Sequence, residues 1–434
     1  MYFSWKKLRS EVFMRKKCLS CFLIILLAVQ SIVLLSSCSE EPDLVPENDS
    51  QESVFQKSES GYHIYGNYVY WRASNNEIYR YDLETFTRRS ACLDAECEGD
   101  CILHEAKGIS GIQNWKLFFN TEATDIEYDE YHRPISSTKR VHYAYQDLHT
   151  GEITVLRTCI GSEIDESVNS GVVLGDSHIY YTVNLLKKDG DPLNANDYIP
   201  TYCRMPIDGG EEEVLFPKTG QTETILMPYE NELIVYRDQV ICAYRIDTGE
   251  FREIYNYENT EFLMKPHTLG YGNGKMYFLG KVGNLLAEKG ETYYNCALVE
   301  LDLKTGAYRK IIDEKVFAYT VDEDGIYYIK TEYNKFLVEG YENVEVSGWA
   351  GDSVYKCDFD GNNETLFYKN SQMRISVPWF LIAGDSIYTQ IRYSGTVRQF
   401  SSADGSSYYQ CGMGFRKIDL ASGKIIDPII PEED

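Results

Sequence analysis

From residue 61 to the end, the chain alternates two short patterns that are typical of β-strands and tight turns. In the first, a turn such as Gly175-Asp176-Ser177 precedes alternating apolar residues. In the second, an aromatic-basic-x-Asp strand ends in a turn, as in Tyr244-Arg245-Ile246-Asp247-Thr248-Gly249. Period-two alternation places apolar side chains on one sheet face, and Asp followed by Gly favours a tight hairpin. Because helical periodicity is nearly absent after residue 38, the pattern predicts an all-β fold.

The spacing of the second pattern predicts the architecture. Its Asp residues recur at positions 82, 147, 208, 247, 302, 358 and 419. Seven units of about four strands each are typical of a β-propeller, whose units run to about 40–50 residues. Although 434 residues would suffice for about three domains, we predict one domain over residues 61–434, a seven-bladed β-propeller. Six or eight blades are the alternative counts, and a tandem of β-sandwiches or an open solenoid is the alternative architecture.

One unit also resembles a known family. The stretch Tyr202-Cys203-Arg204-Met205-Pro206-Ile207-Asp208-Gly209-Gly210, followed by Glu211-Glu212-Glu213-Val214-Leu215, is similar to the repeat of uncharacterised propeller lipoproteins from Gram-positive gut bacteria. That family is related to the TolB-like and YWTD-type propellers, although the Tyr-Trp-Thr-Asp tetrapeptide is absent from this chain. The resemblance covers residues 61–430 and implies a ring of six to eight blades with no assigned activity.

The N-terminal sequence is typical of an export signal. A basic segment, Arg15-Lys16-Lys17, precedes an apolar run over residues 22–35, which is shorter than the roughly 20 residues of a spanning helix. The run ends in Leu35-Ser36-Ser37-Cys38, which resembles the lipobox of bacterial lipoproteins, with Ser37 where Gly or Ala is usual. The resemblance implies a signal peptide over residues 1–37 and a lipid on Cys38. The alternative is an uncleaved anchor helix, and Met14 is a second candidate start.

These features predict where the protein works. Residues 38–60 are polar and acidic, which is typical of a flexible tether. With either the lipid or the anchor helix, the domain is expected on the extracytoplasmic side of a cell membrane. Lys and Arg number 42 against 67 Asp and Glu, a net charge of -25 that would repel the phosphates of nucleic acid. We expect a monomer with no nucleic-acid partner.

Long insertions are predicted on one side of the ring. Strands alternate in direction, so all connections between second and third strands emerge on the same side. The long ones span residues 121–140, 185–201, 281–294, 331–352 and 392–413. Insertions confined to one face of a repeat array commonly mark a binding face. The candidate ligand-binding rings on it are Tyr128, Tyr131, Tyr333, Tyr341, Trp349, Tyr393, Tyr408 and Tyr409. The alternative is that these rings only cap the blade ends beneath them.

The twelve cysteines fall into classes. Six occur about once per unit and are expected to be small apolar fillers: Cys159, Cys203, Cys242, Cys296, Cys357 and Cys411. The cluster Cys92-x4-Cys97-x3-Cys101-x2-His104 differs, because three thiols and an imidazole within 13 residues can wrap a tetrahedral Zn²⁺. Four protein ligands leave no open position, so such a zinc ion would be structural. A disulfide with one spare thiol, or three reduced thiols, are the alternatives.

The resembled lipoproteins carry a similar element here, with a His between the second and third Cys. In this chain Glu98-Gly99 stands at that place, and His104 lies beyond the last Cys. Motifs of catalysis or phosphate binding (Gly-x-Ser-x-Gly, His-Glu-x-x-His, the Walker loop) do not occur, so catalytic residues stay unknown. We predict a binding module for a glycan, a peptide or another envelope partner. A hydrolase or lyase acting on polysaccharide, or a structural factor in envelope assembly, are the alternatives.

Overall fold

The computed structural model describes residues 62–429 outside a set of gaps. The gaps are residues 73–76, 83–84, 86, 95–96, 98, 100, 130, 165–171, 193, 221, 261, 283–295, 314, 323, 331, 338–344, 351–352, 370–379, 384–385, 402–406 and 420–424. The predicted signal peptide, Cys38 and the tether lie outside the described residues. Within them, the chain forms thirty strands and four 3₁₀ turns, of which η2 is Gly161–Glu163, η3 is Ala195–Asp197 and η4 is Tyr257–Asn259.

The first four sheets follow one another along the chain, each with four antiparallel strands. Sheet 1 consists of β1 (Tyr62–Tyr65), β2 (Tyr68–Arg72), β3 (Ile78–Asp82) and β4 (Arg88–Ser90). Sheet 2 consists of β5 (Ala106–Gln113), β6 (Lys116–Tyr128), β7 (Pro134–Asp147) and β8 (Ile153–Ile160). Sheet 3 consists of β9 (Val173–Leu174), β10 (His178–Leu186), β11 (Tyr198–Pro206) and β12 (Glu213–Pro217). Sheet 4 consists of β13 (Thr224–Tyr229), β14 (Glu232–Arg237), β15 (Val240–Arg245) and β16 (Phe251–Asn256).

The remaining sheets include one that is interrupted. Sheet 5 consists of β17 (Phe262–Gly272), β18 (Lys275–Val282), β19 (Cys296–Asp302) and β20 (Tyr308–Ile312). Sheet 6 consists of β21 (Val316–Asp322), β22 (Gly325–Lys330), β25 (Ser353–Cys357) and β26 (Thr365–Lys369). Its halves are separated by a two-stranded hairpin, β23 (Glu332–Leu337) with β24 (Glu345–Ala350). Sheet 7 consists of β27 (Phe380–Ala383), β28 (Ser386–Ser401), β29 (Ser407–Asp419) and β30 (Ile425–Ile429).

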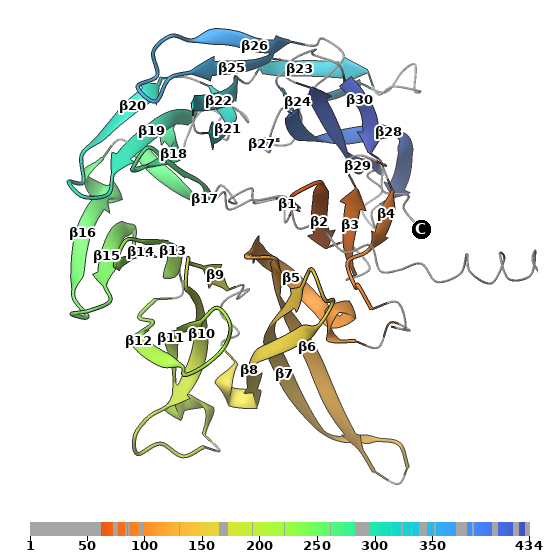
Figure 1. Ribbon diagram of the computed structural model, residues 1–434, viewed down its shortest axis with the longest axis vertical. Coiled ribbons are helices and arrows are strands. Elements are labelled where there is room, and N and C mark those ends of the chain that lie inside the picture. The colour runs from red at the N-terminus through yellow and green to blue at the C-terminus, as the bar shows by residue number, and fades with distance from the viewer. Residues whose placement is uncertain are drawn as a thin grey trace, which may run out of the picture.

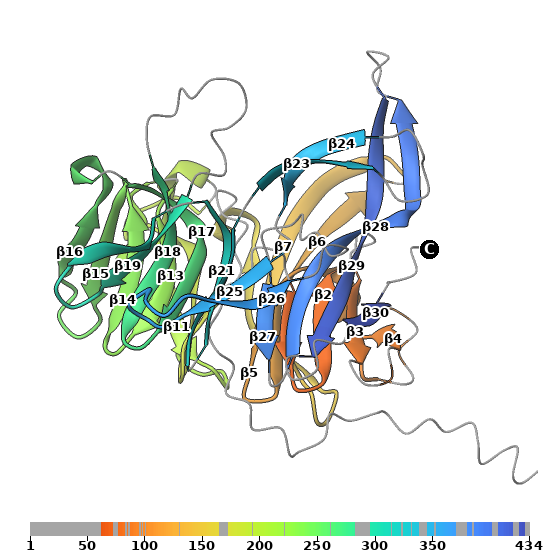
Figure 2. The ribbon, with the colours of Figure 1, turned by 90° about the horizontal axis from the view of Figure 1, so that it is seen from above.

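The sheets are arranged around a ring, with β1, β9, β13, β17 and β21 toward the middle (Figure 1). Sheet 7 lies beside sheet 1 in both views (Figure 1 and Figure 2). The all-β propeller arrangement is therefore confirmed. The count of seven equivalent blades is corrected, because six sheets are uninterrupted meanders of four consecutive strands. The remaining sheet, sheet 6, departs from them because the insertion over residues 331–352 pairs with itself rather than lengthening β22 and β25.

The Asp residues of the second pattern organise the turns between third and fourth strands. The Asp302 carboxylate accepts bonds from the backbone N–H groups of Lys304 (2.9 Å) and Thr305 (2.8 Å). Together with an ion pair to Lys275, these bonds hold the pKa of Asp302 far below its usual range. Asp147 bonds the N–H groups of His149 and Thr150 in the same way. The prediction of Asp-centred tight turns is confirmed at these positions.

Glycine in such a turn also allows neighbouring sheets to approach. Gly306 has a φ of 74°, and a Cβ placed there would lie 2.5 Å from the carbonyl oxygen of Ile254 in β16. Gly361, with a φ of 77°, meets the Ile311 carbonyl oxygen of β20 even more closely. Any side chain at either position would therefore force the turn away from the preceding sheet.

The core of the molecule lies between successive sheets. One cluster joins sheets 2 and 3 through residues such as Phe118 and Ile179, and another joins sheets 4 and 5 through Ile234 and Phe278. Five of the six cysteines expected as fillers are buried: Cys159, Cys203, Cys242, Cys296 and Cys357. That prediction is confirmed for these five, and the side chain of Cys411 lies outside the described residues.

Buried tyrosines add directional contacts between sheets. The Tyr319 hydroxyl of sheet 6 donates a 2.6 Å bond to the backbone oxygen of Tyr277 in sheet 5. The Tyr143 hydroxyl of sheet 2 donates a 3.1 Å bond to the Thr182 oxygen in sheet 3. The Tyr244 hydroxyl of sheet 4 donates a 3.0 Å bond to the Leu215 oxygen in sheet 3. These bonds give part of the tyrosine excess a structural role.

We expect Tyr319→Phe to lower the free energy of unfolding by about 1 kcal/mol, because it removes one buried hydrogen bond and keeps the ring. The measurement is the urea midpoint followed by circular dichroism. Tyr128→Phe is the matched control. The Tyr128 side chain is exposed, so its hydroxyl contacts water and its removal changes the free energy of unfolding little. Equal midpoints for Tyr319→Phe and the unaltered chain would contradict the role of the hydroxyl.

Candidate metal centre and binding face

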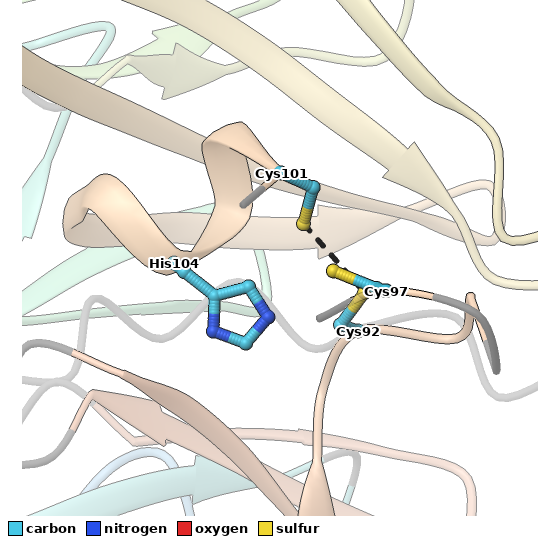
Figure 3. A group of neighbouring side chains, drawn as sticks. All are labelled: Cys92, Cys97, Cys101 and His104. Carbon is cyan, nitrogen blue, oxygen red and sulfur yellow. Dashed lines mark hydrogen bonds between the residues drawn. The ribbon is translucent and has the colours of Figure 1, made fainter. Parts of the chain in front are cut away.

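The Cys/His cluster lies in the connection from sheet 1 to sheet 2. Cys92 follows β4, and the chain then turns through Cys97 and Cys101 into a 3₁₀ turn, η1 (Ile102–Glu105), which carries His104. One ligand atom from each of the four residues lies within 4.8 Å of the others. Figure 3 shows the three sulfurs and the imidazole facing a common centre. Among the described residues, this is the one His, Cys, Asp and Glu group with such geometry.

Local hydrogen bonds fold the connection around this centre. The Cys92 N–H donates to Ser90 Oγ at 3.2 Å, and the Cys97 N–H donates to the Asp94 oxygen at 3.2 Å. The His104 N–H donates to the Cys101 oxygen at 3.1 Å, which closes the first turn of η1. The sequence spacing alone brings the four residues close, and these bonds orient them.

Neighbouring sheets hold the connection at both ends. The side-chain amide of buried Gln146, in β7, donates to the Ala91 oxygen at 2.8 Å and accepts from the Leu93 N–H at 3.0 Å. The Arg72 Nε of β2 donates to the Ala106 oxygen at 2.9 Å, just after η1. Sequence analysis missed Gln146, because nothing in its local pattern indicates a partner more than fifty residues away.

The apolar floor of the cluster belongs to the core between sheets 1 and 2. Leu93 and Leu103 are buried in that core, and Cys92 and Cys101 pack against it. The thiols are half-buried, so a bound ion would be shielded from water on one side. This placement favours a cluster that supports the fold.

The three thiols differ in acidity. Bonds from the backbone N–H groups of Cys101 and Gly99 lower the pKa of Cys97 to about 7. Burial raises the pKa of Cys92 to about 12, and it also raises the pKa of Cys101. Since metals bind thiolates, Cys97 is ready to bind at neutral pH, while a cation must drive the ionisation of Cys92 and Cys101.

The distances fit a tetrahedral ion. Zn–S bonds of about 2.3 Å place two sulfur ligands about 3.8 Å apart in a tetrahedron. The Cys92 and Cys101 sulfurs are 3.6 Å apart, which is close to that spacing and much longer than the roughly 2.0 Å of a disulfide. The donor set of three thiols and one imidazole is typical of structural zinc and leaves no position for substrate. The cluster can therefore bind a metal ion, as predicted.

Three of the five predicted insertions form long hairpins on one side of the ring. The insertion over residues 185–201 joins β10 to β11 through η3, and residues 283–294 of another lie outside the described residues. Figure 2 shows β6–β7, β23–β24 and β28–β29 extending in the same direction. Tyr128 and Tyr131, on the first hairpin, have exposed fractions of 55% and 69%. Tyr333 of β23 is paired across the ladder with Trp349 of β24.

The other predicted rings are placed only by their backbone. Tyr393 lies in β28, and Tyr408 and Tyr409 lie in β29, where they pair with Phe400 and Gln399. Tyr341 falls outside the described residues. The structure thus places the backbones of seven of the eight predicted residues in three hairpins of one side: Tyr128, Tyr131, Tyr333, Trp349, Tyr393, Tyr408 and Tyr409.

Three acids of the first hairpin form ion pairs within it. Asp129 pairs with Arg133 at 2.8 Å, and Asp125 pairs with Arg140. Glu122 pairs with Lys139 at 3.3 Å, across the ladder. These acids therefore stabilise the hairpin rather than forming a free acidic site.

Comparisons with known proteins add the following. No family model matches the chain, and no curated protein matches it. Among solved structures, the computationally designed Ika8 protein is 12% identical with a TM-score of 0.43, and the match covers 86% of this chain and 87% of that chain. Acylaminoacyl peptidase is 16% identical with a TM-score of 0.43, over 82% of this chain and 50% of that chain. This chain therefore matches only half of the peptidase.

A further solved structure, TolB from Acinetobacter baumannii, is 13% identical with a TM-score of 0.30, over 72% of this chain and 69% of that chain. At these identities and scores, none of the likenesses assigns an activity to this chain. In the part of the chain that the structure describes, no helix has the length and apolar character to cross a membrane. The resemblance to lipoproteins of Gram-positive gut bacteria stays a prediction.

Proposed function

We propose that the protein is a binding module that recognises a glycan, a peptide or another envelope partner through its hairpin-bearing face. We define this face by the hairpins β6–β7, β23–β24 and β28–β29. The observation that carries the proposal is their common direction (Figure 2), together with the exposed Tyr128 and Tyr131. A ring whose opposite connections are short Asp turns has its variable chemistry on one side only, as binding repeats commonly do.

We further propose that sheet 6 counts as a seventh blade. Its four strands β21, β22, β25 and β26 pair in the same antiparallel order as in the uninterrupted sheets. The hairpin β23–β24 is inserted between the second and third strands of sheet 6. The corresponding connection of sheet 2 is the long hairpin β6–β7. In this view the interruption is a binding element inserted into an ordinary blade.

The anchor is the second part of the proposal. Cys38 lies three residues after the end of the apolar run, and a lipid on it would attach the ring to the outer side of the cell membrane through residues 39–60. We expect cells fed a labelled fatty acid to incorporate the label into the full chain and to lose it in Cys38→Ser. Ser37→Ala is the matched control, because it moves the site closer to the usual lipobox. Equal labelling of Cys38→Ser would refute the lipid anchor.

The test of the binding face is a paired glycan and peptide array. We expect Tyr128→Ala with Tyr131→Ala to weaken binding of any captured ligand at least about tenfold, since exposed rings supply contact area. Trp349, Tyr408 and Tyr409 changed together to Ala form the second variant. Tyr308→Ala is the control, because Tyr308 is an exposed tyrosine beside the Asp302 turn on the opposite side.

Two outcomes would change the conclusion. Binding that is unchanged in both face variants would refute the hairpin-bearing face as the site. Turnover of a captured polymer would favour a hydrolase or lyase over a binding module.

A structural zinc ion is the second proposal, carried by the common centre of Cys92, Cys97, Cys101 and His104. We expect one zinc ion per purified chain, measured by elemental analysis, and a thermal midpoint that falls after chelation. His104→Ala should lose zinc on dialysis and unfold at a lower temperature. His178→Ala is the control, because His178 lies on β10 and contacts Ser177 rather than the cluster.

Thiol chemistry provides an independent readout. In the metal-free chain, iodoacetamide at pH 7 should modify Cys97 first, because its pKa is about 7 while that of Cys92 is raised to about 12. The reaction should slow as the pH falls below 7 and should stop in the zinc-loaded chain. A purified chain without zinc, with a Cys–Cys bond in its mass spectrum, would support the disulfide alternative instead.

A further inference from the structure

The β6–β7 hairpin extends beyond its sheet and leaves its outer edges open. β5 pairs with β6 only as far as Thr121, and β8 pairs with β7 only from Arg140 onward. Beyond these points, residues 122–128 pair only with β7, and residues 134–139 pair only with β6. No other described strand pairs with these segments. Such edges present backbone N–H and C=O groups in the spacing that an extended chain matches.

The two faces of the extended segment differ in polarity. Residues paired across a ladder share a face, so Ile126 and Ser137 point to the same side, and Tyr128 lies two positions along β6. Ile135 is the extra residue of a bulge beside Tyr128, because Glu127 pairs with Ser136 and Tyr128 pairs with Pro134. Ile126, Tyr128 and Ile135 have exposed fractions of 44%, 55% and 65%. The opposite face carries Asp125 and Glu127, of which Glu127 accepts a 2.7 Å bond from Ser136.

The tip of the hairpin is held in one shape. Asp129 accepts bonds from the N–H groups of Tyr131 (2.8 Å) and Arg133 (2.9 Å), and its own N–H donates to the Arg133 oxygen at 2.8 Å. These bonds lower the pKa of Asp129, so the turn keeps its negative charge at neutral pH. A turn that is already ordered presents Tyr131 with little further loss of entropy on binding.

The chemistry of the apolar face favours a peptide over a sugar. Branched aliphatic side chains at Ile126 and Ile135 offer no hydrogen bonds to hydroxyl groups. Of the nearby acids, Glu122 pairs with Lys139 and Asp125 pairs with Arg140. An extended peptide would satisfy the open backbone edge and place every second side chain against Ile126 and Ile135.

A second copy of the chain fits less well. Antiparallel pairing of two β6 edges would bring Asp125 and Glu127 of one copy beside the same acids of the other, which is unfavourable. On the β7 edge, Pro134 has no N–H to donate and Lys139 carries a charge, both of which limit self-pairing.

We propose that the β6–β7 hairpin binds an extended, apolar peptide segment of a partner protein, which adds a strand to the open edge of residues 122–128, because Pro134 and Lys139 hinder pairing on the β7 edge. The proposal rests on the proposed function and names its partner class. The backbone of the edge supplies affinity, and Ile126, Tyr128 and Ile135 select alternating apolar side chains.

The test is selection of random 12-residue peptides displayed on phage against the full immobilised chain. Selected peptides should carry apolar residues at every second position. Their affinity should fall at least tenfold for the double variant Ile126→Ser with Ile135→Ser, and it should be unchanged for Val155→Ser. Val155 is a matched control because it is an exposed β-branched residue on β8 of the same sheet. Amide hydrogen exchange of residues 122–128 should slow on adding a selected peptide.

Several outcomes would overturn the proposal. They are the failure to enrich any peptide, equal binding to the double variant, protection of amides only elsewhere, or self-association of the chain through the same edge in sedimentation. The chain could bind a glycan but no peptide, and the double variant Tyr128→Ala with Tyr131→Ala could abolish that glycan binding. This result would refute the peptide partner and would leave the proposed function standing. If the unaltered chain binds neither a glycan nor a peptide through the hairpin-bearing face, the proposed function itself is refuted.

Discussion

Contact between successive sheets is the interaction on which the rest of this molecule depends. A four-stranded sheet has two apolar faces, and each hydrophobic cluster here is shared by two neighbouring sheets rather than contained in one. Buried tyrosines such as Tyr319 fix the distance between sheets, because a hydroxyl must reach one backbone oxygen while its ring fills the gap. The stability of the fold therefore depends little on the connections at the strand ends, and these connections can differ from sheet to sheet.

That freedom explains the contrast between the two sides of the ring. Turns after the third strands touch the preceding sheet, as Gly306 and Gly361 do, so their length and residues are constrained by packing. Insertions between the second and third strands can instead pair with themselves, as the described parts of residues 121–140 and 331–352 do. The hairpin β6–β7 and the separate two-stranded sheet β23–β24 are two outcomes of that single possibility.

Local patterns in the sequence predicted what is decided locally. The Asp turns at Asp147 and Asp302 and the proximity of Cys92 to His104 each depend on residues within a short stretch. The ion pairs of the β6–β7 hairpin could not be predicted in this way, because they depend on the register that brings Arg140 to Asp125. The contact of Gln146 with the connection after β4 depends on how two sheets pack. The interruption of sheet 6 likewise follows from pairing between strands that are not adjacent in sequence.

The Cys/His cluster and the β6–β7 hairpin are neighbours because the connection between sheets 1 and 2 leads into the sheet that carries the hairpin. η1 follows the last cysteine ligand and contacts β6, while Glu105 at its end acts electrostatically on His142 in β7. The connection that carries the thiols is itself bonded by Gln146 of β7. An ion bound by Cys92, Cys97, Cys101 and His104 would thus stiffen the segment on which the root of the hairpin rests. A long hairpin with open edges can keep a defined direction only if its root is rigid. The Cys/His cluster and the hairpin are therefore best understood as parts of one structural unit.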